Sequence, residues 1–255
     1  MYPVLFKLGP LEIQTYGFIT AIAFLAGIYL AAWTAQKRGL NKEYIFDLGL
    51  VIIICAILGA RLLYVLEMHA HFLRHPLDIV KVWEGGLIFH GGLIAAVAGS
   101  FAYLKVKKLD VLAYLDTFAP FAALGHSIAR IGCYFAGCCY GKVDEACGVV
   151  FPAVGDNLPH LPVQLYESAA NFVNFLILII LLRFSGLKKG TVLWMYLANY
   201  GIIRFVIEHF RGDYERGMIT ENFSIPMLIS IALFVTGAAG TAWVNRKNGK
   251  TKKII

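Results

Sequence analysis

Three arginines, Arg61, Arg130 and Arg204, interrupt otherwise apolar stretches of the sequence. A guanidinium group stays charged at physiological pH and binds a phosphate through two parallel hydrogen bonds. An ionisable side chain at the centre of a membrane helix costs about 2.5–3.5 kcal/mol on insertion scales, so it usually has a functional role or a partner. The alternative is packing, in which each arginine pairs only with Glu67, Glu208 or backbone carbonyls. The arginines favour a site that recognises an anion.

The polar residues around Arg204 share one face of a predicted helix. Tyr200, Arg204, Glu208 and Arg211 have the spacing i, i+4, i+8 and i+11, which places them on one side of a helix. Arg204 and Arg211 flank Glu208 and would orient each other through it. Some of their guanidinium donors would then remain free to bind an anion. A purely structural ladder of ion pairs is the alternative for Glu208 and Arg211.

A histidine lies within a glycine-rich segment, where Gly85 and Gly86 precede it and Gly91 and Gly92 follow it. Glycine lets the backbone approach a ligand closely, and irregular backbone at membrane depth normally lines a cavity. His90 could accept or donate a proton near neutral pH. The alternative is a packed histidine that only makes hydrogen bonds.

Membrane-spanning helices must position these groups. The chain has 255 residues, of which 59% are hydrophobic and only 15% are charged, whereas a soluble domain carries about 25% charged residues. Apolar stretches near the length of about 20 residues that crosses a bilayer predict an all-α polytopic membrane protein. Its seven transmembrane helices would form one membrane domain over residues 1–255, with outward-facing segments at 67–86 and 130–162. The predicted spans are 17–35, 45–66, 87–104, 111–129, 163–182, 191–210 and 225–244.

The distribution of lysine and arginine predicts the orientation. Fourteen of them lie on one side of the predicted membrane, after the first, third and fifth spans and in the tail, and six lie on the other side. The richer side is cytoplasmic by the positive-inside rule, so we expect the N-terminus outside and the C-terminus in the cytoplasm. Lysines near anionic lipid headgroups explain the net charge of +7, which argues against nucleic acid as a partner.

In this orientation most of the intramembrane polar residues lie at one level, in the outer leaflet. Asp116 is the exception, because it lies nearer the cytoplasmic end and is typical of a packing or capping residue. This coincidence predicts a positive, water-accessible cavity that takes an anion with acyl chains, that is, a phospholipid headgroup. The residues at that level are Tyr16, Arg61, His90, Arg130, Gln164, Tyr166, Glu167, Tyr200, Arg204 and Glu208.

Over essentially its whole length the sequence resembles the prolipoprotein diacylglyceryl transferase family. The resemblance rests on the following motifs: Tyr16-Gly17, Gly59 with Arg61, His90-Gly91-Gly92-Leu93-Ile94, Asp116, Arg130-Ile131-Gly132 with Gly137 and Gly141, Gln164-Leu165-Tyr166-Glu167, Tyr200-Gly201 with Arg204, Glu208 and Arg211, and Ser224-Ile225-Pro226. It implies a seven-span protein of the bacterial cytoplasmic (inner) membrane whose active site faces the outer leaflet. It also implies transfer of a diacylglyceryl group from phosphatidylglycerol to the lipobox cysteine thiol in the signal peptide of a prolipoprotein, with release of glycerol phosphate. No metal and no organic cofactor is implied.

The resemblance also assigns roles to residues. Arg130 and Arg204 would be catalytic, because they stabilise the negative charge that builds on the phosphate as it leaves. His90 would be the base that deprotonates the thiol, and the field of the arginines is the alternative source of thiolate. The residues expected to bind phosphatidylglycerol are Arg61, Arg130, Arg204, Tyr16, Gly91, Gly92, Gln164, Tyr200 and Glu208.

The central signature departs from the family pattern. Cys133 stands where the family has asparagine, Cys138 where it has glutamate and Lys142 where it has arginine. Arginine and lysine are not equivalent in bidentate anion binding, so the contacts around the headgroup are in question.

Four cysteines, Cys133, Cys138, Cys139 and Cys147, lie close together in the sequence on the predicted outward side. Disulfides form in that compartment, and a bridge from Cys147 to Cys138 or Cys139 is one interpretation. Reduced thiols without a special role, a metal site and a reactive thiol are the others. The spacing lacks the paired Cys-x2-Cys of ordinary zinc sites.

Three other functions compete with the transferase. A paralogous transferase of the same fold would use a different lipid donor or thiol acceptor. A lipid or anion transporter would show internal repeats, and the sequence contains no convincing one. A retinal photoreceptor would need a lysine in the seventh span, and residues 225–244 contain none.

Overall fold

The computed structural model describes residues 2–8, 11–184, 186–213, 217–220 and 223–246. The chain divides into two compact units, which are treated separately. The first unit contains Met1–Ala31 and Leu115–Ile255, and the second contains Ala32–Tyr114. Several basic residues that enter the predicted orientation lie outside the described residues: Arg216, Lys247, Lys250, Lys252 and Lys253.

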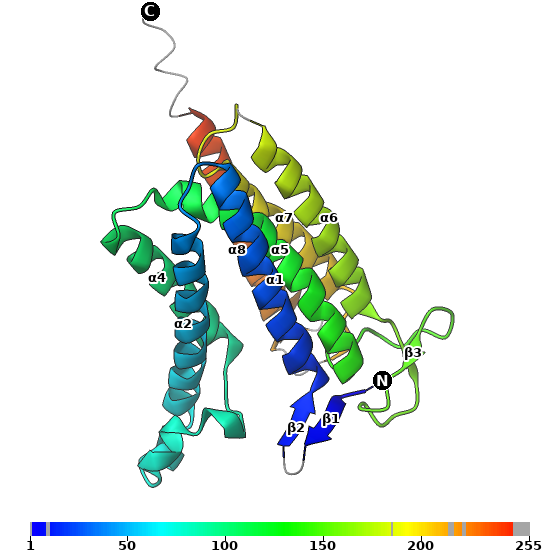
Figure 1. Cartoon of the computed structure of the whole chain (residues 1–255). Coiled ribbons are helices and arrows are strands. Elements are labelled where there is room, and N and C mark those ends of the chain that lie inside the picture. The colour runs from blue at the N-terminus through cyan, green and yellow to red at the C-terminus, as the bar shows by residue number, and fades with distance from the viewer. Residues whose placement is uncertain (1, 9–10, 185, 214–216, 221–222, 247–255) are drawn as a thin grey trace, which may run out of the picture. The chain divides into compact units, whose positions relative to one another are not determined.

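Seven helices of 18 residues or more account for most of the described chain (Figure 1). They coincide with the seven predicted stretches, and they are α1 (Thr15–Lys37), α2 (Glu43–Glu67), α4 (Phe89–Val106), α5 (Val111–Ala136), α6 (Val163–Arg183), α7 (Thr191–Glu208) and α8 (Ile225–Arg246). Within the described ranges, α1, α2, α4, α6 and α8 are long and apolar enough to cross a membrane. The chain is therefore a mostly helical, multi-pass membrane protein.

Helices α5 and α7 carry ionisable residues within their apolar sequences. Helix α5 carries Asp116, His126 and Arg130, and α7 carries Arg204 and Glu208. Helix α5 is also longer than the predicted span 111–129, because it continues through Ala136. This corrects the predicted boundary of the outward segment, since Arg130 lies on the helix and not in a loop.

In the second unit, glycines allow α2 and α4 to pack backbone to backbone. A Cβ atom on Gly91 would lie 2.4 Å from the carbonyl oxygen of Gly59, and one on Gly92 would lie 2.8 Å from that of Ala56. Such distances exclude any side chain, as in the small-residue interfaces of membrane helices. The glycines that follow His90 therefore have a packing role, whereas the sequence had suggested contact with a ligand.

We expect Gly91→Ala to destabilise the second unit by about 1–3 kcal/mol, the usual cost of overpacking. The new methyl group meets backbone, which cannot move aside as a flexible side chain would. Thermal unfolding in detergent measures the effect. The control is Gly17→Ala, because a Cβ there meets no atom within 4 Å. Equal melting temperatures for Gly91→Ala and the wild type would contradict the packing role.

Arg61 organises the segment between α2 and α4. This segment contains α3 (His69–Phe72) and two 3-10 helices, η1 (Pro76–Val80) and η2 (Val82–Glu84). The buried guanidinium donates from Nε to the carbonyl oxygen of Ile79 at 2.9 Å, from Nη1 to those of Gly85 at 2.7 Å and Gly86 at 3.2 Å, and from Nη2 to that of Asp78. Backbone carbonyls thus use most of its donors, and this matches the packing alternative for Arg61.

In the first unit, α5, α6, α7 and α8 lie side by side (Figure 1), and α1 joins them through residues 15–31. Small residues again permit close contact, because a Cβ on Gly201 of α7 would lie 2.6 Å from the carbonyl oxygen of Ser230 on α8. Asp116 caps α7, accepting hydrogen bonds from the backbone N–H groups of Gly190 at 2.6 Å and Leu193 at 2.8 Å. This confirms the predicted capping role of Asp116.

Short antiparallel strand pairs flank the helices of the first unit. They are β1 (Val4–Leu8) with β2 (Leu11–Gln14), β3 (Val149–Val150) with β4 (Pro159–His160), and β5 (Met218–Thr220) with β6 (Phe223–Ser224). Backbone hydrogen bonds also hold the segment 140–143. The N–H of Gly141 donates to the carbonyl oxygen of Leu161, just before α6, at 2.9 Å, and that of Lys142 donates to the carbonyl oxygen of Phe210, just after α7, at 2.9 Å. The loop after α5 is thereby tied to the start of α6 and the end of α7.

Candidate active site

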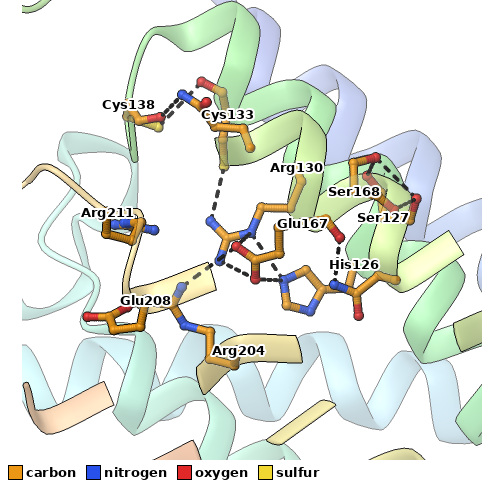
Figure 2. Close-up of polar contacts among 12 residues, drawn as sticks. His126, Ser127, Arg130, Cys133, Cys138, Glu167, Ser168, Arg204, Glu208 and Arg211 are labelled. Carbon is orange, nitrogen blue, oxygen red and sulfur yellow. Dashed lines mark hydrogen bonds and ion pairs between the residues drawn. The ribbon is translucent and has the colours of Figure 1, made fainter. Parts of the chain in front are cut away.

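Glu167 is the centre of a buried cluster of charges in the first unit. It lies near the start of α6 and is 1% exposed. Arg130 of α5 binds it side-on, with Nε 3.0 Å from Oε2 and Nη2 3.0 Å from Oε1. Two parallel contacts of this kind fix the plane of the guanidinium. Figure 2 shows the two groups facing each other.

Arg204 of α7 reaches the same carboxylate. Its Nη1 lies 3.7 Å from Oε2 of Glu167, and its Nη2 lies 2.8 Å from Oε2 of Glu208. Ser224 donates a hydrogen bond of 2.7 Å to the other oxygen of Glu208. We call Arg130, Glu167, Arg204 and Glu208 the ion-pair chain. It brings together the two arginines for which the sequence predicts catalysis.

The charge of this cluster differs from the sequence expectation. The sequence predicts a positive cavity, but two carboxylates balance the two arginines of the ion-pair chain. Anion-binding capacity therefore depends on donors that the carboxylates do not use. Nη1 of Arg204 has no hydrogen bond within the described residues, and Nη1 of Arg130 lies 3.9 Å from Sγ of Cys133. The side chains of Arg130 and Arg204 are 15% and 13% exposed.

His126 joins the cluster one helical turn before Arg130. Its Nε2 is 3.2 Å from Nε of Arg130 and 3.3 Å from Oε1 of Glu167. Its ring packs on Tyr200 of α7, with 5.0 Å between ring centroids. The site thus contains an imidazole in contact with both an arginine and a carboxylate.

Tyr16 and Gln164 also belong to this part of the first unit. The Tyr16 ring lies against Gly132, where an added Cβ would be 3.3 Å from the ring. Gln164 is buried and donates from Nε2 to the carbonyl oxygen of Cys138 at 2.7 Å. Its amide therefore supports the loop after α5. Arg211 lies just past α7 and pairs with Asp213, with 2.7 Å between Nε and Oδ1.

Three of the four cysteines that follow each other in this part of the sequence meet beside Arg130. The sulfur atoms of Cys133, Cys138 and Cys139 lie within 4.8 Å of one another. Cys147 is exposed and does not belong to this group. All five cysteines of the chain are free in the structure, so none forms the disulfide that was one interpretation of the sequence.

His90, Gly91, Gly92 and Arg61 belong to the second unit. His90 is exposed on the first turn of α4, and its ring contacts Phe89 with 5.9 Å between centroids. Within the part of the chain that the structure describes, no hydrogen bond involves its ring nitrogens. Arg61 and the two glycines, by contrast, are occupied by contacts within their unit.

Sequence comparisons decide the family. The family described as prolipoprotein diacylglyceryl transferase matches residues 3–243 of the chain. The chain belongs to the prolipoprotein diacylglyceryl transferase family.

Relatives in this family are similar to the chain over nearly their full length. Proteins named phosphatidylglycerol–prolipoprotein diacylglyceryl transferase are 36% identical in Geobacter sulfurreducens (96% of this chain and 96% of the relative), 35% in Desulfotalea psychrophila (98% and 95%) and 37% in Clostridium tetani (92% and 96%). The family resemblance inferred from the motifs is confirmed.

In this diacylglyceryl transferase family member, the sequence did not indicate the role of two residues of the cluster. Glu167 was placed at the level of the predicted cavity, in the segment Gln164-Leu165-Tyr166-Glu167, but without a role in binding or catalysis. His126 precedes Arg130 by four residues, and this i, i+4 spacing was the available signal. A charged or titratable residue one turn from an intramembrane arginine could have been selected on that ground.

Outside the membrane helices of this family member, acid should weaken the loop that leads to α6. The carboxylate of Asp156 accepts a hydrogen bond from the N–H of Leu158 at 3.0 Å and lies 2.8 Å from Nε2 of His160. These contacts, first that of Leu158, hold the pKa of Asp156 below its ordinary value. The ionised form then stabilises the fold above the unfolded pKa of about 4, and this contribution is lost as pH falls through the folded pKa.

We therefore expect the difference in melting temperature between the wild type and Asp156→Asn to be largest near neutral pH and to shrink as the pH falls below about 4. Thermal unfolding in detergent across this range measures it. A constant difference at every pH would show that the carboxylate charge makes no contribution.

Proposed function

We propose that the chain is a phosphatidylglycerol–prolipoprotein diacylglyceryl transferase. The observation that carries this proposal is the meeting of two guanidinium groups from different helices at Glu167, each with an Nη1 group that no carboxylate binds through a hydrogen bond. The names of the relatives in three bacteria support the same reaction.

The reaction moves a diacylglyceryl group from oxygen to sulfur. The lipobox cysteine thiolate attacks the glyceryl carbon that carries the phosphate, a C–S bond forms and the C–O bond breaks. The bonding electrons remain on the phosphate oxygen, and glycerol phosphate leaves. Arg130 and Arg204 donate from their Nη1 groups to this phosphate, where fixed donors in a site of low dielectric constant have their largest effect.

Deprotonation of the thiol needs a base or a positive field, because a free thiol has a pKa near 8.5. His90 is the candidate that the resemblance implies, and its exposed ring has no competing partner in the described structure. His126 is the candidate that the geometry adds, because it contacts Arg130 directly at 3.2 Å. A pH–rate profile of His90→Gln and His126→Gln distinguishes them, because loss of the true base removes the fall in rate at low pH, where that base would be protonated.

The proposal includes the placement of the protein. All seven long helices cross the bacterial inner membrane, with the N-terminus outside and the C-terminus in the cytoplasm. The ion-pair chain then lies in the outer leaflet, where phosphatidylglycerol and the signal peptide of a prolipoprotein can both reach it. Cysteine labelling of the N-terminal segment in intact spheroplasts tests this orientation.

Reconstituted protein tests the reaction itself. Purified full-length chain in phosphatidylglycerol vesicles should convert a lipobox peptide to a thioether-linked diacylglyceryl peptide, detected by mass spectrometry. A peptide with serine in place of the lipobox cysteine is the control and should remain unmodified. No lipidated product from well-folded protein would refute the proposal, and product from a different lipid donor would assign the paralogous activity.

A further inference from the structure

The sulfur atoms of Cys133, Cys138 and Cys139 converge although the sequence separates them unevenly. Cys133 lies on the last turn of α5, and the chain then reverses at Gly137, whose φ is +75°, and at Cys139, whose φ is +62°. The reversal returns two thiols to the helix end, within 4.8 Å of the first. Spacing alone therefore could not predict the cluster.

The loop that carries the thiols is held in place by hydrogen bonds. The N–H of Cys138 donates to the carbonyl oxygen of Cys133 at 3.2 Å, and the buried amide of Gln164 donates to the carbonyl oxygen of Cys138 at 2.7 Å. The sulfur atoms are thus brought together by backbone that other contacts fix. The three sulfur atoms are therefore preorganised for a ligand.

The separations suit a soft divalent cation. A zinc ion binds thiolates at about 2.3 Å, so ligands at tetrahedral angles lie about 3.8 Å apart. Sulfur atoms within 4.8 Å reach this arrangement after shifts of about 1 Å or less. Thiolates select zinc and similar ions over calcium and magnesium, which prefer oxygen ligands.

Charge and access agree with such a ligand. Three thiolates and one divalent cation carry a net charge of −1, and the guanidinium of Arg130 lies 3.9 Å from the sulfur of Cys133. Cys133 is buried, Cys139 is half-buried and Cys138 is exposed, so an ion can approach from the Cys138 side. Three protein ligands also leave the fourth tetrahedral position open, as in catalytic zinc sites.

We propose that Cys133, Cys138 and Cys139 form a binding site for a soft divalent cation, which in the cell is zinc. The fourth coordination position of the bound ion is open to water or to an external thiolate. This proposal rests on the positions of the three sulfur atoms and does not depend on the proposed transferase activity.

Cobalt titration of the full-length protein in detergent, reduced and free of added metal, tests the site. Cobalt held by three thiolates in tetrahedral geometry gives an intense sulfur-to-metal absorption band. We expect this band to saturate at one ion per chain and to disappear when zinc displaces cobalt. Cys138→Ser and Cys139→Ser should each abolish the band, and both positions are accessible enough to spare the fold.

Cys147→Ser is the matched control, because it removes an exposed thiol from the same outward segment but not from the cluster. It should leave the band unchanged. The proposal is overturned if the wild type shows no band while its five thiols titrate as free. It is also overturned if thiol titration shows that two cysteines of the cluster remain joined in a disulfide after reduction. Survival of the band in both serine variants would overturn it as well.

Discussion

Replacing Arg130 by lysine should lower kcat for diacylglyceryl transfer by about 10²–10³-fold, the usual cost of removing one donor from a developing anion. Lysine keeps the positive charge, but it lacks the planar fork that binds Glu167 through Nε and Nη2 and keeps Nη1 away from that carboxylate. Initial rates of thioether formation with phosphatidylglycerol vesicles and a lipobox peptide measure the effect.

Arg183→Lys is the matched control, because Arg183 is exposed at the end of α6. We expect its kcat to equal that of the wild type. Wild-type kcat in Arg130→Lys would mean that a point charge suffices, and the proposed role of the guanidinium fork would be wrong.

Glu167→Gln should both destabilise the protein and impair turnover. The glutamine has the same shape, but two buried guanidiniums lose the carboxylate that they share. Removing one partner from a buried ion pair typically costs about 3–5 kcal/mol. We expect a lower melting temperature, and a kcat reduced by about 10²-fold because Arg130 is no longer oriented.

The two kinetic constants should respond differently to this change. The KM for phosphatidylglycerol should not rise, since loss of a negative charge leaves the arginines more attractive to phosphate. Glu145→Gln, at an exposed position in the loop after α5, should change neither stability nor rate. If kcat of Glu167→Gln is that of the wild type in folded protein, the carboxylate has only a structural role.

The sequence was sufficient to locate the helices and the two arginines that meet. Apolar runs of membrane length are a local property of the chain, and all seven coincide with long helices. Arg130 and Arg204 were identifiable because a charge within such a run is costly. Asp116 was also correctly interpreted, since a lone carboxylate near a helix end commonly caps a neighbouring backbone.

Contacts between helices were the part that the sequence could not give. Glu167 became the centre of the site only when α6 placed it between Arg130 and Arg204, and no spacing rule connects residues on three helices. The glycines beside His90 have the composition of a ligand-binding segment, yet the backbone of α2 occupies the space next to them. Arg61 likewise binds carbonyls of a segment that follows it in the chain.

The ion-pair chain also bears on how the protein enters the membrane. Glu208 lies one turn from Arg204 on the same helix, so the positive charge of α7 already has its partner when this helix is synthesised. Arg130 has its carboxylate on α6, which follows a few seconds later at a synthesis rate of about 5–20 residues per second. We expect α5 to stay beside the insertion machinery until Glu167 has emerged, so that these helices pass into lipid together and not one at a time.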